Sequence, residues 1–126
     1  ELLVSEWLTE KIGRKVWCDG QLQANWWTMA PVGLLTRAPG EGDTQLTLDS
    51  VLFDLDWYGK NADHVRKAAE QARGLLRLQL PLHTFADGTF VTAVQTISAP
   101  CWAPEFERGT FRRTAAYRVI LHSTIS

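Results

Sequence analysis

Two aspartates set two positions apart are the strongest candidates in the sequence for a metal site or a catalytic pair. Asp54 and Asp56 stand in the run VLFDLDWYG, and carboxylates this close together can hold a divalent cation or share a proton. Strand alternation would place both side chains on one face of a sheet. A metal site needs further carboxylate or histidine ligands at the same place, and alternation puts Asp49 on the other face. We therefore expect no metal site and no catalytic residue, and interpret the pair as facing solvent or a partner.

The remaining reactive side chains do not form a catalytic or ligand pattern. The three histidines, His64, His83 and His122, are scattered, without an HxH or HExxH pattern. Cys18 stands beside Asp19, but no GxSxG elbow occurs. The glycines of GEGDT do not follow the strand-to-helix pattern of phosphate-binding loops. The sequence thus predicts no cofactor and no enzyme activity.

The bulk composition is that of one folded domain spanning residues 1–126. Apolar residues make up 45% of the chain and charged residues 21%, which is typical of a globular protein with a single core. With 13 basic and 14 acidic residues the net charge is −1, which disfavours nucleic-acid binding by general phosphate attraction. Because no apolar run approaches the roughly 20 residues of a membrane span and the start lacks a signal-peptide pattern, we expect a soluble cytoplasmic protein without a membrane partner. We interpret Cys18 and Cys101 as buried or half-buried thiols in that reducing compartment.

Hydrophobic periodicity predicts two helices and four or five strands. The first helix covers residues 2–12 and ends at Gly13, and the second covers 62–79 and follows the N-cap Asn61. The predicted strands span 28–37, 45–57, 89–98 and 111–124, with a candidate short strand at 16–17 and a loop over 99–110. Together they predict an α+β fold, in which a mixed, mostly antiparallel sheet of about four to five strands has two amphipathic helices packed on one face.

One predicted strand, VLFDLDWY, defines the two faces of this sheet. Val51, Phe53, Leu55 and Trp57 point to one side, and both aspartates point to the other. We expect the apolar side to meet the helices and the other side to be left for water or a partner. Gly74 costs about 1 kcal/mol relative to alanine inside a helix, so we predict that it allows close packing of the second helix.

A basic patch precedes and enters the last strand. Its basic residues are Arg108, Arg112, Arg113 and Arg118, interleaved with Phe106, Phe111 and Tyr117. Three interpretations are open: arginines on phosphates with aromatics on bases, a strand with a charged outer face, or electrostatic matching. In the third, Arg113 and Arg118 meet Asp54 and Asp56 on a neighbouring strand or on a neighbouring subunit, and this matching sets register and partner choice.

Six tryptophans are more than a small core can easily bury. Trp26 and Trp27 cannot both point inward from an extended segment, and Trp102 lies in the predicted loop between prolines. Large aromatic residues are enriched at protein–protein interfaces. The candidate contact residues are therefore Asp54, Asp56, Arg112, Arg113, Arg118, Trp26, Trp27 and Trp102.

With this layout the sequence resembles the tail-terminator, or tail-completion, proteins of long-tailed bacteriophages. The strand VLFDLDWYGKN followed by ADHVRKAAEQARGLL is similar to the family's strand, short turn and amphipathic helix. The stretch TFVTAVQTISAPCWAPEFE is similar to its strand with a proline-containing loop, and RRTAAYRVILHS to its closing strand. The opening helix LLVSEWLTEKIG also fits, so the resemblance covers most of the chain.

The resemblance implies a structural virion protein without catalysis or cofactor. Such a subunit forms a six-membered ring with copies of itself, caps the tail tube protein, stops polymerisation and offers a joining surface to the head–tail connector. It implies a place at the head-proximal end of the tail, after assembly in the host cytoplasm, and no specific nucleic acid or membrane partner. The near alternative is another head–tail connector, head-closure or minor tail protein. A small nucleic-acid-binding protein, or an enzyme that uses the two aspartates, would be a different class.

Overall fold

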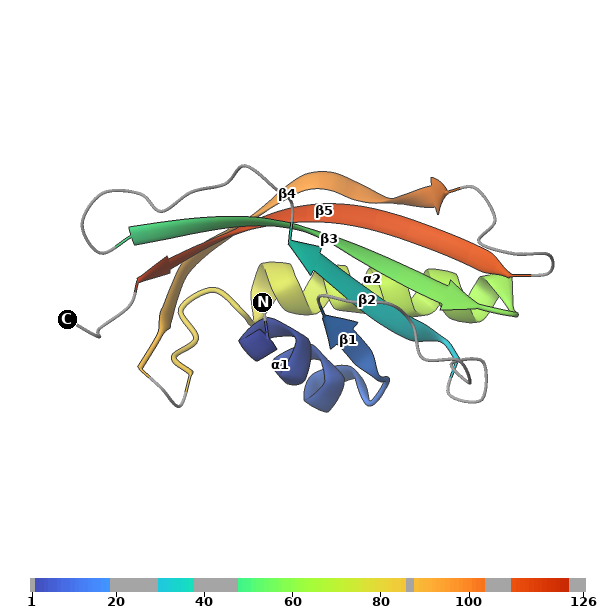
Figure 1. Ribbon diagram of the computed structural model, residues 1–126, viewed down its shortest axis with the longest axis horizontal. Helices are drawn as coiled ribbons and strands as arrows, with labels where there is room; N and C mark the ends of the chain where they lie inside the picture. Colours follow the sequence, from blue (N-terminus) through green and yellow to red (C-terminus); the bar gives the residue numbers. More distant parts are fainter. Residues whose placement is uncertain (1, 19–29, 38–47, 86–87, 104–109, 123–126) are drawn as a thin grey trace.

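The chain forms one sheet with two helices packed against the same face. The structure is a computed structural model that describes residues 2–18, 30–37, 48–85, 88–103 and 110–122. Both helices lie beneath the curved sheet, with α2 running along its length and α1 beside it (Figure 1). The α+β class predicted from the sequence is confirmed. Neither helix in this part of the chain is long and apolar enough to cross a membrane.

The sheet has five strands in the order β1-β2-β3-β5-β4. The elements are α1 (Leu2–Ile12), β1 (Val16–Cys18), β2 (Val32–Arg37), β3 (Leu48–Gly59), α2 (Ala62–Leu78), β4 (Phe90–Ala103) and β5 (Phe111–His122). β1 and β2 pair in parallel, and the other neighbouring strands pair antiparallel. The long strands β3 and β5 thus lie at the centre, with β1 and β4 at the two edges of the described sheet.

The sheet face that the helices cover, called the covered face below, holds the main core. Phe53, Leu55 and Trp57 of β3 are each 1% exposed, and Tyr117 of β5 is fully buried. The buried stripe of α2 consists of Val65, Ala68, Ala69, Ala72 and Leu76. Small alanine side chains let the helix axis come close to the strands, and each large apolar side chain buried here contributes about 1.5–3 kcal/mol. The alternation predicted for β3 is therefore confirmed.

Local signals fix the start and the solvent side of α2. Asn61 has extended backbone angles, and its side chain accepts a hydrogen bond from the backbone N–H three residues on, at 3.1 Å; such a cap contributes about 1 kcal/mol. Arg66 pairs with Asp63 at 2.7 Å and with Glu70 at 3.2 Å, and Lys67 pairs with Asp63 at 3.1 Å. The charges on this side of the helix therefore neutralise one another.

The structure corrects the loop predicted over 99–110. β4 continues through Pro100 to Ala103, so the beginning of the predicted loop is strand. Pro100 is tolerated because β4 is an edge strand of the described sheet, where a missing N–H need not break a ladder bond. A register shift between Ser98 and Cys101 absorbs the irregularity.

The close approach of α2 to the sheet occurs at a glycine other than the one predicted. A Cβ built on Gly74 would meet no atom within 4 Å, so the prediction that this residue serves close packing is wrong. At Gly59, the last residue of β3, a Cβ would lie 2.7 Å from Val65 Cγ2. The first turn of α2 thus crosses the end of β3 over a strand glycine.

Candidate functional site

The sheet face that neither described helix covers is called the open face below. The register of β3 and β5 places Asp56 opposite Thr114 and Tyr58 opposite Arg112. Residues diagonally opposite on neighbouring strands are within reach of long side chains. Arg112 can therefore contact both Tyr58 and Asp56.

An ion pair between Arg112 and Asp56 is the centre of the open face. Arg112 Nη2 donates to Asp56 Oδ2 at 3.0 Å, and the Tyr58 hydroxyl donates to the same oxygen at 3.5 Å. The guanidinium carbon lies 5.9 Å from the centroid of the Tyr58 ring, within cation–π range. The Asp56 side chain is 10% exposed and the Arg112 side chain 34%. Loss of the arginine would leave a poorly solvated carboxylate without its counter-charge.

Burial and the proximity of the two carboxylates raise two pKa values on the open face. The pKa of the Tyr58 hydroxyl is raised, first by burial and then by the negative charge of Asp56. The pKa of Asp54 is raised by the same two causes in the same order, and the charge of Arg112 opposes the rise. Asp54 is exposed, so it is the carboxylate that an approaching group can reach.

The aspartates do not belong to a ligand cluster within the described part of the chain. Nowhere among these residues do three His, Cys, Asp or Glu side chains stand together so as to hold a metal ion. The open face provides the guanidinium of Arg112 next to the carboxylates of Asp54 and Asp56. The Tyr58 hydroxyl donates a hydrogen bond to the Asp56 carboxylate. Such an arrangement suits the orientation of a contacting surface.

Exposed aromatic side chains lie where β4 ends and β5 begins. Trp102 is 48% exposed and Phe111 is 37% exposed, and their ring centroids are 6.2 Å apart at an interplanar angle of 62°. The guanidinium carbon of Arg113 lies 4.8 Å from the centroid of the Trp102 ring. The hollow beside them, of about 440 Å³, is lined by Ala62, Trp102, Ala103, Phe111 and Arg112. Aromatic residues left exposed beside a hollow are typical of protein contact sites.

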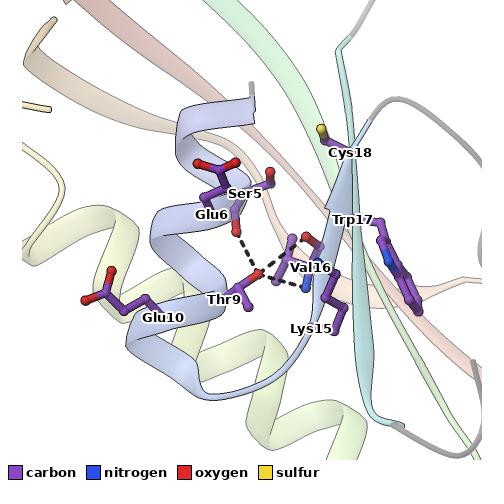
Figure 2. Close-up of a pocket in the computed structure, with 8 residues that line it drawn as sticks. All are labelled: Ser5, Glu6, Thr9, Glu10, Lys15, Val16, Trp17 and Cys18. Carbon is purple, nitrogen blue, oxygen red and sulfur yellow. Dashed lines mark hydrogen bonds between the residues drawn. The ribbon is translucent and has the colours of Figure 1, made fainter. Parts of the chain in front are cut away.

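A second hollow lies along β1, between this strand and α1 (Figure 2). The Thr9 hydroxyl donates to the Ser5 carbonyl at 2.8 Å and accepts from the Val16 N–H at 3.0 Å, so it ties the helix to the strand. Figure 2 shows Glu10 projecting from α1 on the side away from the strand, whereas the Thr9 side chain points toward Val16. The hollow has a volume of about 380 Å³ and is lined by Ser5, Glu6, Thr9, Glu10, Lys15, Val16, Trp17 and Cys18.

The structure brings together two pairs of the predicted contact residues, Asp56 with Arg112 and Arg113 with Trp102. Asp56 was expected to face solvent or a partner. It does not face solvent, because the residue is only 7% exposed. Its counter-charge comes from a neighbouring strand of the same subunit. Arg118 lies opposite Leu52 on β3 and Gln95 on β4, further along the open face.

The predicted placement of Arg113 with the aspartates on a neighbouring strand of the same subunit is wrong, and its placement on a neighbouring subunit stays a prediction. Arg113 lies opposite Trp57 of β3, which belongs to the covered face, and it stacks on Trp102 instead. The sequence alternation was assigned one position out of phase at the start of β5, and this exchanged the roles of Arg112 and Arg113. The contribution of Tyr58 was not predicted either, although it shares the period-two alternation of the aspartates.

Two further predictions concern tryptophan and cysteine. Trp26 and Trp27 lie outside the described residues, so only Trp102 of the three predicted contact tryptophans can be placed. Both cysteines are free, with Cys18 half-buried and Cys101 exposed. The expected burial is wrong for Cys101, because the strand that carries it is an edge strand rather than a buried one.

The geometry of these surfaces is the basis for a functional proposal, since the comparisons with known proteins add no family. No model of a protein family matches the chain, and no curated protein matches it.

Proposed function

We propose that the chain is a tail-terminator subunit, which forms a ring on the end of a phage tail tube, stops its polymerisation and provides the surface that joins head to tail. The observation that supports this best is the position of the three stretches that resemble the family. They fold into β3 with α2, into β4 and into β5. These elements are neighbours in the sheet, so the resemblance follows a contiguous structural unit rather than scattered residues.

The surfaces of the subunit support a binding role. The open face carries a fixed ion pair with Asp54 beside it. Trp102 at the end of β4 and Phe111 at the start of β5 lie beside a hollow. Hot spots of protein interfaces combine large aromatic residues and arginine in this way. The proposed partners are further copies of the chain in a six-membered ring, the tail tube protein on one side and the head–tail connector on the other.

Electron microscopy of the protein mixed with purified tail tubes tests the proposal. We expect rings at tube ends and no further elongation of capped tubes. Absence of rings and of binding to tubes at every concentration would contradict the proposal. Rings that bind the isolated connector but not tubes would favour a head-closure or minor tail protein.

The variant Trp102→Ala tests whether the aromatic end takes part. We expect reduced occupancy of tube ends, because the exposed ring would contribute to a contact. Ile97→Ala is the matched control, since Ile97 is also exposed, at 50%, on the same strand. Equal capping by Trp102→Ala and by the control would assign the contact to another part of the surface.

Two measurements separate the proposal from the other classes. Tight, salt-sensitive binding of DNA by the purified protein would favour a nucleic-acid role for the arginines of β5. Metal-dependent turnover that Asp54→Asn abolishes without unfolding the protein would favour an enzyme.

A further inference from the structure

Lys11 and four other charged side chains on the two helices have no opposite charge within hydrogen-bonding range among the described residues, and those four form two like-charged pairs. Glu6 and Glu10 of α1 are exposed, Arg77 of α2 is exposed and Arg73 is half-buried. None of them makes an ion pair within this part of the chain, whereas the charges on the solvent side of α2 all pair with one another. The four are therefore available to an external partner.

Their spacing is the same on both helices. Glu6 and Glu10 are four residues apart on α1, and Arg73 and Arg77 are four residues apart on α2. Side chains at this spacing are neighbours on a helix, with Cβ atoms about 5–6 Å apart, and like charges there destabilise the helix. Each helix thus carries a local repulsion that a matching pair of opposite charges would relieve.

The acidic pair lies at the β1 edge of the molecule. Glu6 and Glu10 line the hollow between α1 and β1 (Figure 2), and β1 is an edge of the described sheet. The apolar wall of the hollow, formed by Val16, Trp17 and Cys18, can cover the methylene stems of long basic side chains. The Val16 N–H is already bonded to the Thr9 hydroxyl, so the hollow suits side chains rather than an added strand.

The basic pair lies on the opposite flank of the helix layer, toward β5 and β4. Burial raises the pKa of the Tyr117 hydroxyl in β5 to about 12, and the nearby charges of Arg73 and Arg77 oppose that rise. The buried Arg73 Nε has no hydrogen-bond partner among the described residues. The other flank of α2 instead lines a hollow with Arg14 and Pro31, on the side of β2.

We propose that two copies of the chain associate through these charges, with α1 of one copy beside the Arg73–Arg77 flank of α2 in the next. Glu6 and Glu10 pair with Arg73 and Arg77. The acidic and basic pairs lie at opposite edges of one subunit, so each copy presents one pair to each of two neighbours. This is a heterologous contact, which repeats head to tail and closes into a ring when the rotation allows. The inference rests on the proposed ring and names its subunit interface.

Charge reversal with complementation tests this interface. Variant A carries Glu6→Arg and Glu10→Arg, and variant B carries Arg73→Glu and Arg77→Glu. Each variant alone sets like charges against each other, and we expect its self-association constant, measured by sedimentation velocity over a concentration series, to fall at least about 100-fold. An equimolar mixture of A and B restores both contacts around an even-numbered ring, and we expect wild-type association to return.

Two further variants keep the result interpretable. Lys67→Glu with Gln71→Glu places two acids at the same spacing on another side of α2, and we expect wild-type association from it. If reversal of the half-buried Arg73 unfolds the protein, the single substitutions Glu10→Arg and Arg77→Glu replace variants A and B. High salt should weaken wild-type association, because it screens the charge pairs; an association held by apolar contacts alone would not be weakened.

The outcomes separate the interface from the function. Three outcomes would each overturn the interface. The reversed variants could associate like the wild type, the mixture of A and B could fail to restore association, or the wild type could stay monomeric at every concentration and on tube ends. Rings with the predicted rescue that do not bind tail tubes would support the interface and contradict the tail-terminator function. Capping of tubes that is insensitive to both reversals would support the function and contradict the interface.

Discussion

The two faces of the sheet use the same strand in opposite ways. On the covered face, β3 contributes Phe53, Leu55 and Trp57, which belong to the main core together with the buried stripe of α2. On the open face the same strand contributes Asp56 and Tyr58, whose burial depends on particular atoms of Arg112. Apolar packing is non-directional, whereas a buried ion pair requires a fixed geometry. The covered face therefore stabilises the fold, and the open face fixes the register of β5 against β3.

The open face also has a small apolar part. Val32 is fully buried and Tyr58 is 5% exposed, and Trp17, Ala30 and Leu34 pack against them. This cluster lies over β1, β2 and the end of β3, beside the ion pair. The contrast between the faces is thus between a large core and a small cluster that surrounds one charge pair.

Removal of the largest buried ring should have the largest effect. We expect Trp57→Ala to lower the free energy of unfolding by about 3–5 kcal/mol, because the cavity left against α2 cannot collapse completely. Urea denaturation followed by circular dichroism measures it. Trp102→Ala is the control and should cost well under about 1 kcal/mol, since half of that side chain is already exposed. Similar losses for both variants would contradict the assignment of Trp57 to the core.

Removal of the arginine from the open face should have the next effect. Arg112→Ala leaves Asp56 buried with only the Tyr58 hydroxyl, and we expect a loss of about 2–3 kcal/mol in the free energy of unfolding. A double-mutant cycle with Asp56→Ala measures the coupling. A coupling energy near zero would mean that the pair contributes no more than an exposed surface ion pair.

Two glycine-to-alanine variants should shift stability in opposite directions. Gly59→Ala places a methyl group against Val65 at the α2 crossing, and we expect a loss of about 1–2 kcal/mol from overpacking. Gly74→Ala meets open space, and we expect a gain of about 0.5–1 kcal/mol from helix propensity. Thermal unfolding of both proteins in one buffer tests the pair, and a loss for Gly74→Ala would show that the helix contacts another surface there.

The smallest effect concerns the exposed aspartate of the open face. The pKa of Asp54 is raised above its ordinary value of 3.8, so the folded state holds the proton more tightly and stability falls as pH rises through that raised pKa. Asp54→Asn should therefore add a few tenths of a kcal/mol at pH 7, with no gain below about pH 3. Asp63→Asn is the control of opposite sign, because hydrogen bonds to Arg66 and Lys67 lower the pKa of Asp63, and its contribution is lost as pH falls. Identical pH profiles for the two variants would contradict these shifts.

The local sequence pattern was sufficient to predict the elements that have one apolar and one polar side. β3 alternates cleanly and α2 has a cap and an alanine stripe, so both were predicted to within a few residues. The length of β4 was not predictable, because Pro100 is a strong loop signal that only the edge position of the strand overrides. The roles of Arg112 and Arg113 depend on the register of β5 against β3, and two adjacent arginines give no local signal for which one faces inward.

The charge pairs on the helices show a different limit. The four-residue spacing of Glu6 with Glu10 and of Arg73 with Arg77 is visible in the sequence. Whether each pair is neutralised inside the subunit depends on which helix flanks meet, and this is a property of the tertiary fold. The sequence pattern alone does not distinguish these charges from the charges on the solvent side of α2, which pair with one another.

The irregular ladder of β4 has a consequence for the solubility of the free subunit. An edge strand of 14 residues would offer a long template for intermolecular strand pairing and fibrous aggregation. Three register shifts against β5 and the missing N–H of Pro100 interrupt that template, and the Thr9 hydroxyl blocks part of the opposite edge. We therefore expect copies of the chain to resist joining through these sheet edges, so that contacts between copies are left to side chains.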